Sequence, residues 1–364
     1  MSRTVLITPS WQVSIWNGVA RLSESVAEAL SMLGRDVIVI TPAIPNGGAH
    51  RRWADGIQVL EVDDVPRGFG WRKNVIQALN TLRAIDEVVV IDSPAWHSCK
   101  TELVKLGVPV LGIVLFGQSI QGEKIVSPKT DSLIAEEDEF ITDVSRVLVN
   151  NEVLRNRLNI KFERDIEKLE MVASPCPEIE VLESRPVAKQ QGLAVVVGKI
   201  GPELGVEKII RAMPDLKWLT LKIIGMPRSE WEMKRLTFLI ERLELESRIE
   251  FLGYQKTRQT LEWIQAAEML VAPSLVEYFG YSVMDAMLMR TAVVASTANV
   301  HIELIQDGDT GILFHNIDEL KYALNSMHES SELRAHYIQA SYKKVHEERS
   351  IKTMADSLAD LVGV

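Results

Sequence analysis

Cysteine, long apolar runs and an excess of basic residues are all scarce or missing in this sequence. Two cysteines in 364 residues, Cys99 and Cys176, cannot build a disulfide scaffold or a four-cysteine zinc site. The longest apolar run, Gly107–Gly117, is far shorter than the roughly 20 residues that a membrane-spanning helix needs. Residues 1–10 read as a first strand and not as a signal peptide. We therefore expect a cytoplasmic protein, and the net charge of −10 excludes a global attraction to nucleic acid or anionic lipid.

The sequence is instead rich in short β-branched runs that alternate with stretches of helical periodicity. Apolar residues make up 46% of the chain and charged residues 25%, as in globular proteins, and the length suggests about two domains. Continuous apolar runs separated by helices are typical of parallel strands buried on both faces, so we predict an α/β protein with doubly wound sheets. The predicted strands are 4–7, 36–41, 57–62, 87–91, 108–114, 146–149, 193–197, 219–224, 249–252, 269–272 and 292–295. The predicted helices include 18–33, one from about 206, 230–245 and the charged stretch 332–362.

The alternation pauses at Ser174–Gly192, where three prolines and several charges predict an interdomain linker. We place one domain over residues 1–180 and a second over residues 181–345. Ligands of such sheets lie at the carboxyl ends of the strands, so the turns after strands should hold the functional residues.

A glycine-containing loop follows the first strand of the second half. Residues 197–208 read VGKIGPELGVEK, so a strand runs into a loop that opens a helix. Free backbone N–H groups and the positive end of a helix favour a phosphate there, and Lys199 adds a mobile charge. The loop is not a Walker motif, and an ordinary surface lysine on a turn is the alternative.

Two carboxylates in residues 273–287 (PSLVEYFGYSVMDAM) give a second signal. Glu277 and Asp285 are eight residues apart, with Tyr278-Phe279-Gly280 as a tight turn before a helix that should start near Tyr281. Both carboxylates could then face a ligand at the start of the helix. For Asp285 the alternative is a favourable interaction with the helix dipole.

These motifs resemble those of retaining GT-B glycosyltransferases, especially family 4, the glycogen-synthase-like and mannosyltransferase-like group. Its members commonly read PS-xx-E-x-FG-xxxx-EAM, and here Asp285 replaces the second Glu. The 197–208 loop resembles the family's phosphate loop, and Ile223-Ile224-Gly225, Phe251–Tyr254 and Asp307–Leu313 resemble three further elements in the expected order. In the first half only short segments match, chiefly 17–21 (NGVAR).

The resemblance implies two Rossmann-like domains facing each other across a cleft, the first binding the acceptor and the second the nucleotide sugar. It also implies that the C-terminal helix, 346–364, packs back on the first domain. Glu277 would bind hydroxyls of the donor sugar, and Asp285 would contact the ribose diol. Lys199 would neutralise the diphosphate, and Gly18 would let its loop approach the phosphates.

The remaining donor contacts also follow from the resemblance. Backbone N–H groups of the turn would bind the sugar and the distal phosphate, from Tyr278, Phe279, Gly280 and Tyr281. The backbone near Tyr254 would recognise the base. Such enzymes usually need no metal or other cofactor, since basic side chains and helix ends stabilise the leaving diphosphate.

Three positions depart from the family pattern. Leu204 stands where the phosphate loop usually has Lys, Asn17 replaces the first Gly of the GG loop, and Phe116 stands where a His near the sugar is expected. These changes suggest an unusual donor, a shifted site or a catalytically inactive homologue.

Three other side chains are weaker candidates. Asp92 and His97 follow a strand end and, with Phe116, could lie on the acceptor or sugar side. A local hydrogen-bonding role is the alternative for His97. His301 precedes a short helical stretch, and we expect it to cap that helix and not to face the sugar.

Basic and aromatic residues interleave twice in the first half. Such a patch could receive DNA or a membrane surface as acceptor, or could be a solvated loop face. Its residues are Arg51, Arg52, Trp53, Trp71, Arg72 and Lys73.

The resemblance favours a retaining glycosyltransferase that moves a sugar from a nucleoside-diphosphate sugar to an unidentified hydroxyl. One alternative is a glycosyltransferase acting on DNA bases, of the kind some phages use. Another is an inactive GT-B subunit that binds a partner, which Leu204 and Phe116 would explain. Glu277 is the residue that we expect to be most damaging to lose.

Overall fold

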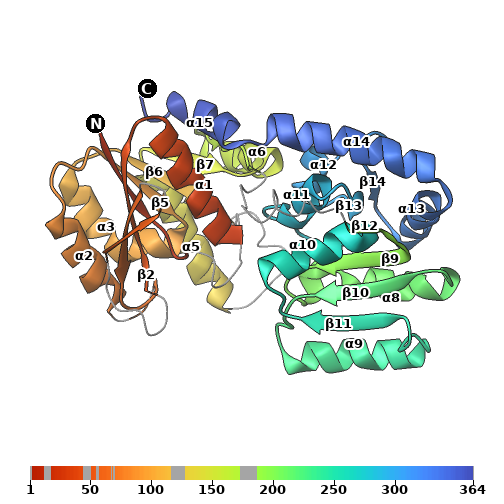
Figure 1. Cartoon of the computed structure of the whole chain (residues 1–364). Coiled ribbons are helices and arrows are strands. Elements are labelled where there is room, and N and C mark those ends of the chain that lie inside the picture. The colour runs from red at the N-terminus through yellow and green to blue at the C-terminus, as the bar shows by residue number, and fades with distance from the viewer. Residues whose placement is uncertain are drawn as a thin grey trace. The chain divides into compact units, whose positions relative to one another are not determined.

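The structure is a computed structural model that describes residues 2–11, 18–43, 51–54, 57–66, 68, 70–115, 128–172 and 187–363 (Figure 1). For residues 51–54 and 128–130 it describes the backbone alone. The chain divides into two compact units. Residues 1–172 and 351–364 form the first, and residues 173–350 form the second, so the boundaries lie a few residues from the expected 180 and 345.

The first unit is built on one sheet in the order β3-β4-β2-β1-β5-β6-β7-β8 among the described residues. All neighbours are parallel except β3, which runs antiparallel to β4 at the edge. The central strands consist almost wholly of buried apolar residues, since helices cover both faces. The strands are β1 (Arg3–Ile7), β2 (Asp36–Pro42), β3 (Arg51–Ala54), β4 (Ile57–Val62), β5 (Glu87–Ile91), β6 (Val110–Val114), β7 (Arg146–Val149) and β8 (Glu167–Lys168).

The helices of this unit include one from the far end of the chain. The last helix, α15, packs against α1 within the first unit. Its inner face is formed by Met354, Ala355 and Leu358, all buried. The helices are α1 (Gly18–Met32), α2 (Trp71–Thr81), α3 (Ser93–Leu106), α5 (Pro128–Asp143), α6 (Glu152–Phe162) and α15 (Ile351–Ala359).

The second unit contains a six-stranded parallel sheet in the order β11-β10-β9-β12-β13-β14. This is the strand order 3-2-1-4-5-6 of a doubly wound fold, so the predicted α/β class is confirmed. The strands are β9 (Gln190–Val197), β10 (Thr220–Ile224), β11 (Ile249–Gly253), β12 (Ala267–Ala272), β13 (Ala292–Ser296) and β14 (Ile312–Phe314).

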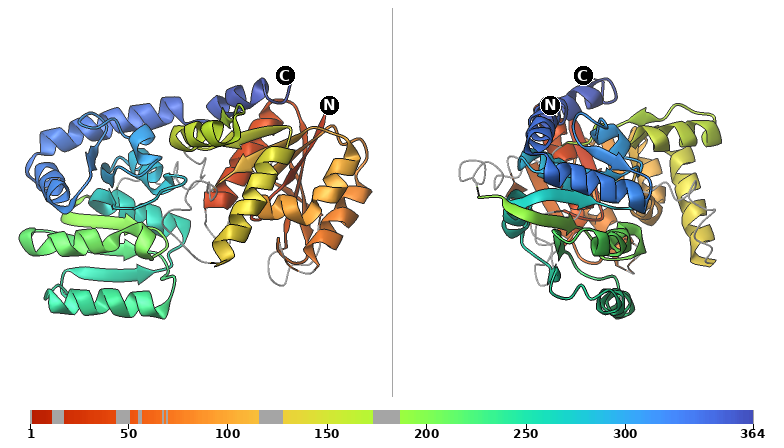
Figure 2. Two further views of the ribbon diagram at one scale, coloured as in Figure 1. Left: turned by 180° about the vertical axis from the view of Figure 1, so that it is seen from behind. Right: turned by 90° about the vertical axis from the view of Figure 1, so that its right-hand side faces the viewer.

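Helices flank this sheet on both faces, as the views in Figure 2 show. One face packs on α8, α9 and α13, which share an apolar core with the strands, and α10 and α11 contact other parts of β9, β12 and β13. The helical elements are η1 (Pro202–Leu204), α8 (Val206–Ala212), η2 (Met213–Asp215), α9 (Glu230–Arg242), α10 (Thr257–Ala266), α11 (Tyr281–Leu288), α12 (His301–Leu304), α13 (Ile317–Glu329) and α14 (Ser331–Glu348). Among the described residues, none of the helices in either unit is long and apolar enough to cross a bilayer.

The strand order of the second sheet brings two loops together. The order reverses between β9 and β12, and the loops that follow these strands meet at the carboxyl edge. The Leu275 amide donates to the Glu203 carbonyl across 2.7 Å, which ties one loop to the other. An ideal Cβ on Gly205 would lie 2.1 Å from the Pro273 carbonyl oxygen, so the two backbones are in direct contact. The fold therefore places the two loops singled out in the sequence side by side.

Cys99 is predicted to be chemically inert. It lies on α3 with no exposed surface, and burial together with the nearby Glu102 charge raises the pKa of its thiol to about 12. Because only the thiolate is reactive, on the order of 10⁻⁴ of this thiol is ionised at pH 8. In a Cys176→Ser variant, a disulfide reagent should titrate less than about a tenth of a thiol until denaturant is added. Rapid reaction of the folded variant would contradict this burial.

Candidate functional site

The Glu277 carboxylate closes the turn between β12 and α11. Its Oε1 accepts three backbone hydrogen bonds, from the amides of Tyr278, Phe279 and Gly280, each at 3.1 Å. Its Oε2 accepts a longer hydrogen bond from Ser274 Oγ, at 3.4 Å. Three converging N–H groups form a concave donor cluster of the type that binds anionic oxygens. The turn is thus built to hold a negatively charged or hydroxyl oxygen, and Glu277 supplies one here.

The turn depends on Gly280. Its φ of 70° lies in the left-handed region, and α11 begins at the next residue, Tyr281, as predicted. An ideal Cβ at Gly280 would lie 2.4 Å from Leu304 Cδ1 and 3.0 Å from Val300 Cγ1. The short helix α12 therefore packs directly against the turn.

Lys199 lies in the neighbouring loop, between β9 and η1. Its side chain is exposed, and no carboxylate in the described parts of the chain pairs with it. Leu204, at the position where the family pattern has Lys, is 9% exposed and belongs to the apolar core of the second unit. Lys199 is therefore an exposed cation of this loop, whereas Leu204 packs in the core.

The structure places Asp285 differently from the prediction. It lies beyond the first turn of α11, which contains no acidic residue, and it has no exposed surface. α11 starts at Tyr281 and Asp285 is its fifth residue, so the carboxylate lies about one turn into the helix. A contact with a ribose would require the buried carboxylate to become exposed.

Tyr254 follows β11 at the same carboxyl edge of the sheet and is 51% exposed. Gly253, just before it, has a φ of 64° and accepts a backbone hydrogen bond from Gly225 across 2.9 Å. The end of β11 is thereby tied to the end of β10. An exposed aromatic ring at this edge can lie against a planar base.

His301 does not cap α12, so that prediction was wrong. Val300 is the N-cap residue, and no side chain caps the helix. The ring is instead fully buried, with Nδ1 3.0 Å from the Ser296 carbonyl oxygen. A lone His in an apolar stretch gave no signal of this contact, since Ser296 belongs to the preceding strand.

In the first unit the candidates have local partners. Asp92 caps α3 by accepting from the Ser93 amide at 3.0 Å, and the His97 Nε2 lies 2.9 Å from Glu139 Oε2 on α5. The contact with Glu139 supports the local role that the sequence left open for His97, and the cap is a local role for Asp92. Gly18 is the first residue of α1. Phe116 lies outside the described residues, as does Asn17.

The prediction of a basic-aromatic patch is partly wrong. Trp71 is fully buried in the core of the first unit, so its ring is not available to stack on a base. It begins α2 and shares a buried face with Val75 and Leu79, a four-residue spacing that is visible in the sequence. Arg72 pairs with Glu102 on α3 at 3.2 Å, and Lys73 is exposed. The side chains of Arg51, Arg52 and Trp53 lie outside the description.

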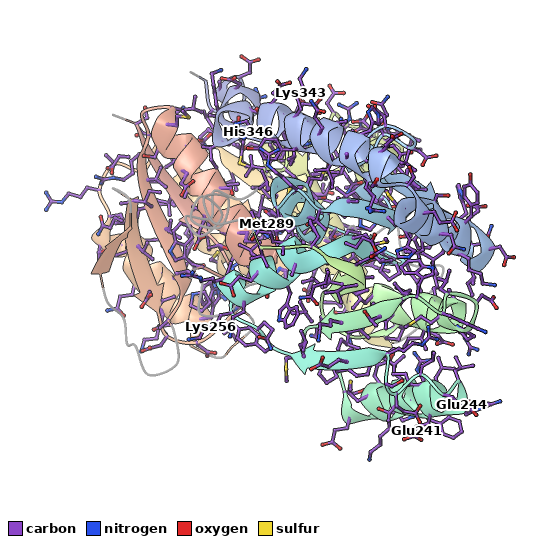
Figure 3. The ribbon with its side chains drawn as sticks, turned by 45° about the vertical axis from the view of Figure 1, so that its right-hand side comes forward. Glu241, Glu244, Lys256, Met289, Lys343 and His346 are labelled. Atoms are coloured by element: carbon purple, nitrogen blue, oxygen red, sulfur yellow. The ribbon has the colours of Figure 1, made fainter. Side chains whose placement is uncertain are left out.

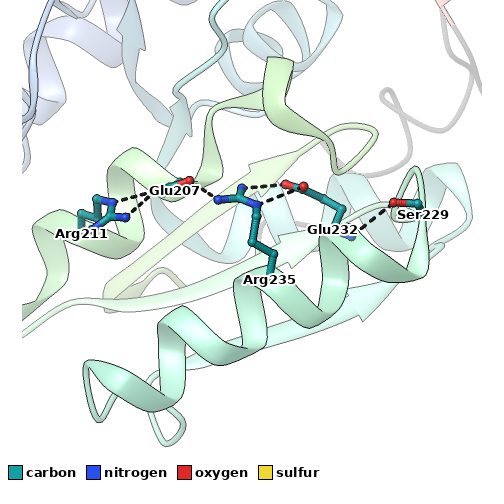
Figure 4. Close-up of polar contacts among 5 residues, drawn as sticks. All are labelled: Glu207, Arg211, Ser229, Glu232 and Arg235. Atoms are coloured by element: carbon teal, nitrogen blue, oxygen red, sulfur yellow. Dashed lines mark hydrogen bonds and ion pairs between the residues drawn. The ribbon is translucent and has the colours of Figure 1, made fainter.

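A groove of about 520 Å³ lies next to the Lys199 loop in the second unit. Gly201, Gly205 and Leu275 line its end, and α8 and α9 supply its walls. Four of its charged side chains pair with one another, as Figure 4 shows: Arg235 pairs with both Glu207 and Glu232. The same Glu207 accepts from Arg211 at 2.6 Å. Lys208 also lines the groove and lies over the ring of Phe314.

Comparison with known proteins finds a family match in the second unit. Residues 179–344, which contain both loops, match the family model of glycosyl transferases group 1. Over these residues the chain is similar to the group 1 glycosyltransferases. This match agrees with the sequence resemblance.

Curated relatives are similar over different lengths. A D-inositol 3-phosphate glycosyltransferase from Mycolicibacterium smegmatis is 26% identical over 193 residues, which cover 50% of this chain and 44% of that protein. The chain thus spans less than half the length of this relative. An uncharacterized glycosyltransferase from Methanocaldococcus jannaschii is 21% identical over a match that covers 97% of this chain and 96% of that protein.

Solved structures are similar over the whole chain. Sucrose-phosphate synthase from Thermosynechococcus elongatus has a TM-score of 0.81 at 15% identity and covers 99% of this chain and 98% of its own. HepE from Anabaena in complex with UDP-glucose has a TM-score of 0.75 at 16% identity and covers 100% of this chain and 99% of its own. These likenesses establish the GT-B fold, with two Rossmann-like domains.

Proposed function

We propose that this chain transfers a sugar from a nucleoside-diphosphate sugar to an acceptor hydroxyl with retention of anomeric configuration. The observation that carries the proposal is the turn at Glu277, where three backbone N–H groups converge beside the Lys199 loop. Cleavage of the sugar–phosphate bond leaves a charged diphosphate, and prearranged N–H groups with a cation stabilise that charge. HepE, which shares the fold, has been crystallised with UDP-glucose, which makes UDP the first nucleotide to test.

The roles of the residues follow from this proposal. Glu277 would accept hydrogen bonds from sugar hydroxyls, and Lys199 would bind the diphosphate. In the donor complex, the amides of Tyr278, Phe279 and Gly280 would donate hydrogen bonds to oxygens of the donor instead of to the Glu277 carboxylate. Tyr254 would lie near the base, and the leaving phosphate itself would take the proton of the acceptor. We propose no side-chain base.

Leu204 supports one competing function, an inactive subunit that binds a partner. Its apolar side chain removes a positive charge from the phosphate loop and is part of the core. Turnover of any nucleotide sugar by the purified chain would exclude this alternative.

The decisive experiment is calorimetric titration of the purified chain with UDP, GDP, ADP and TDP. Micromolar binding of one nucleotide identifies the base, and the matching nucleotide sugars are then screened for hydrolysis and transfer. Asp285→Ala, assayed in parallel, tests the ribose assignment, which predicts weaker binding. If no nucleotide binds, the donor site is absent and the transferase proposal fails.

Lys199→Ala should weaken binding of the selected nucleoside diphosphate by about tenfold, since one charge-assisted contact is lost. The matched control is Lys234→Ala on the outer side of α9, which should leave affinity unchanged. The wild-type affinity should also fall with added salt more steeply than that of the Lys199→Ala variant. Equal affinity of wild type and Lys199→Ala would remove Lys199 from the phosphate site.

A further inference from the structure

His301 is buried beneath the turn that carries Glu277. It lies on α12, has no exposed surface, and is flanked by Val300 and Leu304, whose side chains contact the Gly280 position. The backbone of the turn therefore lies on α12. Neither the family motifs nor the proposed chemistry gives this histidine a role.

A chain of polar contacts leads from His301 to Glu277. A carbonyl oxygen can only accept, so the contact of Nδ1 with the Ser296 carbonyl places the ring proton on Nδ1. Ser296 Oγ in turn donates to the carbonyl of Ser274, and Ser274 Oγ donates to Glu277 Oε2. The end of β13 is thus linked to the loop after β12 by buried side chains.

The second ring nitrogen makes this arrangement costly. Nε2 of His301 is buried without a hydrogen-bond partner among the described residues. A buried polar atom without a partner loses the hydrogen bonds that it made to water in the unfolded chain, so an apolar side chain would pack there more favourably. Packing alone does not explain an imidazole at this position, whereas its contact with Ser296 does.

The charge state of the ring matters for Glu277. Burial lowers the pKa of His301, and this effect exceeds the opposing influences of the Glu277 charge and the Ser296 carbonyl. The ring is therefore neutral at neutral pH. A protonated ring would attract the carboxylate away from the three amides, whereas a neutral one leaves it on the turn.

We infer that His301 is a positioning residue for Glu277, acting through Ser296 and Ser274. The neutral ring anchors Ser296 at the end of β13, and Ser296 holds the Ser274 backbone from which the turn begins. The effect of this positioning on catalysis rests on the proposed function. The positioning of Glu277 by His301 does not depend on that function.

Three substitutions separate the two ring nitrogens. His301→Asn keeps an N–H donor near the place of Nδ1 and lacks Nε2. His301→Gln keeps a polar group near the place of Nε2 and lacks the donor to Ser296. His301→Leu lacks both.

The first measurement is hydrogen exchange of the Tyr278, Phe279 and Gly280 amides, which Glu277 protects. Exchange should be at least about tenfold faster in the Gln and Leu variants than in wild type, and near wild type in the Asn variant. Glu277→Ala is the positive control for lost protection. The Leu313 amide, which Asp307 Oδ1 holds at 2.8 Å in β14, should not change.

Retained protection in both Gln and Leu variants would overturn the inference. An equal loss of protection at the Leu313 amide would also overturn it, because that loss indicates general destabilisation. So would protection of the turn amides in the Gln variant but not in the Asn variant. The second measurement is turnover of the nucleotide sugar found by calorimetry: kcat should fall about tenfold in the Gln and Leu variants, with the Kd for the free nucleoside diphosphate unchanged. If wild type turns over no nucleotide sugar while the exchange pattern holds, the proposed function fails and the positioning role stands.

Discussion

Replacing Glu277 by Gln should reduce kcat for sugar transfer by about 10²–10³, the usual cost of losing one prearranged group at a charged transition state. The side chain keeps its size, so the turn still forms. The amide has half the acceptor capacity of a carboxylate and no charge, so it holds a sugar hydroxyl less well. The measurement is the rate of nucleoside diphosphate release from the sugar nucleotide found by calorimetry.

The control for this prediction is Glu241→Gln. Glu241 lies near the end of α9 on the surface, as Figure 3 shows, and the same change of charge there should leave kcat unchanged. The Kd of the free nucleoside diphosphate should change by less than about threefold in Glu277→Gln, because Glu277 is assigned to the sugar and Lys199 to the diphosphate. If kcat of Glu277→Gln equals that of Glu241→Gln, Glu277 has no catalytic role.

The sequence predicts the central strands well because continuous apolar runs have one stable environment, the middle of a covered sheet. The predicted ranges 57–62, 87–91 and 146–149 match β4, β5 and β7 residue by residue. The edge strands β3, β8 and β14 were missed. They have two to four residues each, and β3 (RRWA) carries the charges that edge strands often have.

The positions of the two functional loops could also be predicted, because loops after parallel strands share one edge of the sheet. The burial of polar side chains could not. The environment of Asp285 depends on α14, which packs on α11 from a distant part of the sequence, and that of His301 depends on the end of β13. Local spacing therefore placed these residues near the loops but did not predict that their side chains are buried.

Gly205→Ala should be strongly disruptive to the second unit. Gly205 has a φ of 69°, and an ideal Cβ there would lie 2.1 Å from the Pro273 carbonyl oxygen and 3.0 Å from its carbon. Because the obstacle is backbone, no side-chain rotation relieves the overlap, and the two loops must separate. We expect a loss of about 3–5 kcal/mol in the free energy of unfolding, beyond the 1–3 kcal/mol of left-handed strain alone.

Gly308→Ala is the matched control for that change. Gly308 has a φ of 76°, but no atom lies within 4 Å of its ideal Cβ, so the substitution adds strain without a clash. Urea unfolding of both variants should show a difference of at least about 2 kcal/mol, with Gly205→Ala the less stable. Equal stabilities would mean that the loops after β9 and β12 are not in contact in solution. Since Lys199 and Glu277 lie on these two loops, the same variant should lose nucleotide binding and sugar transfer together, whereas Gly308→Ala should keep both.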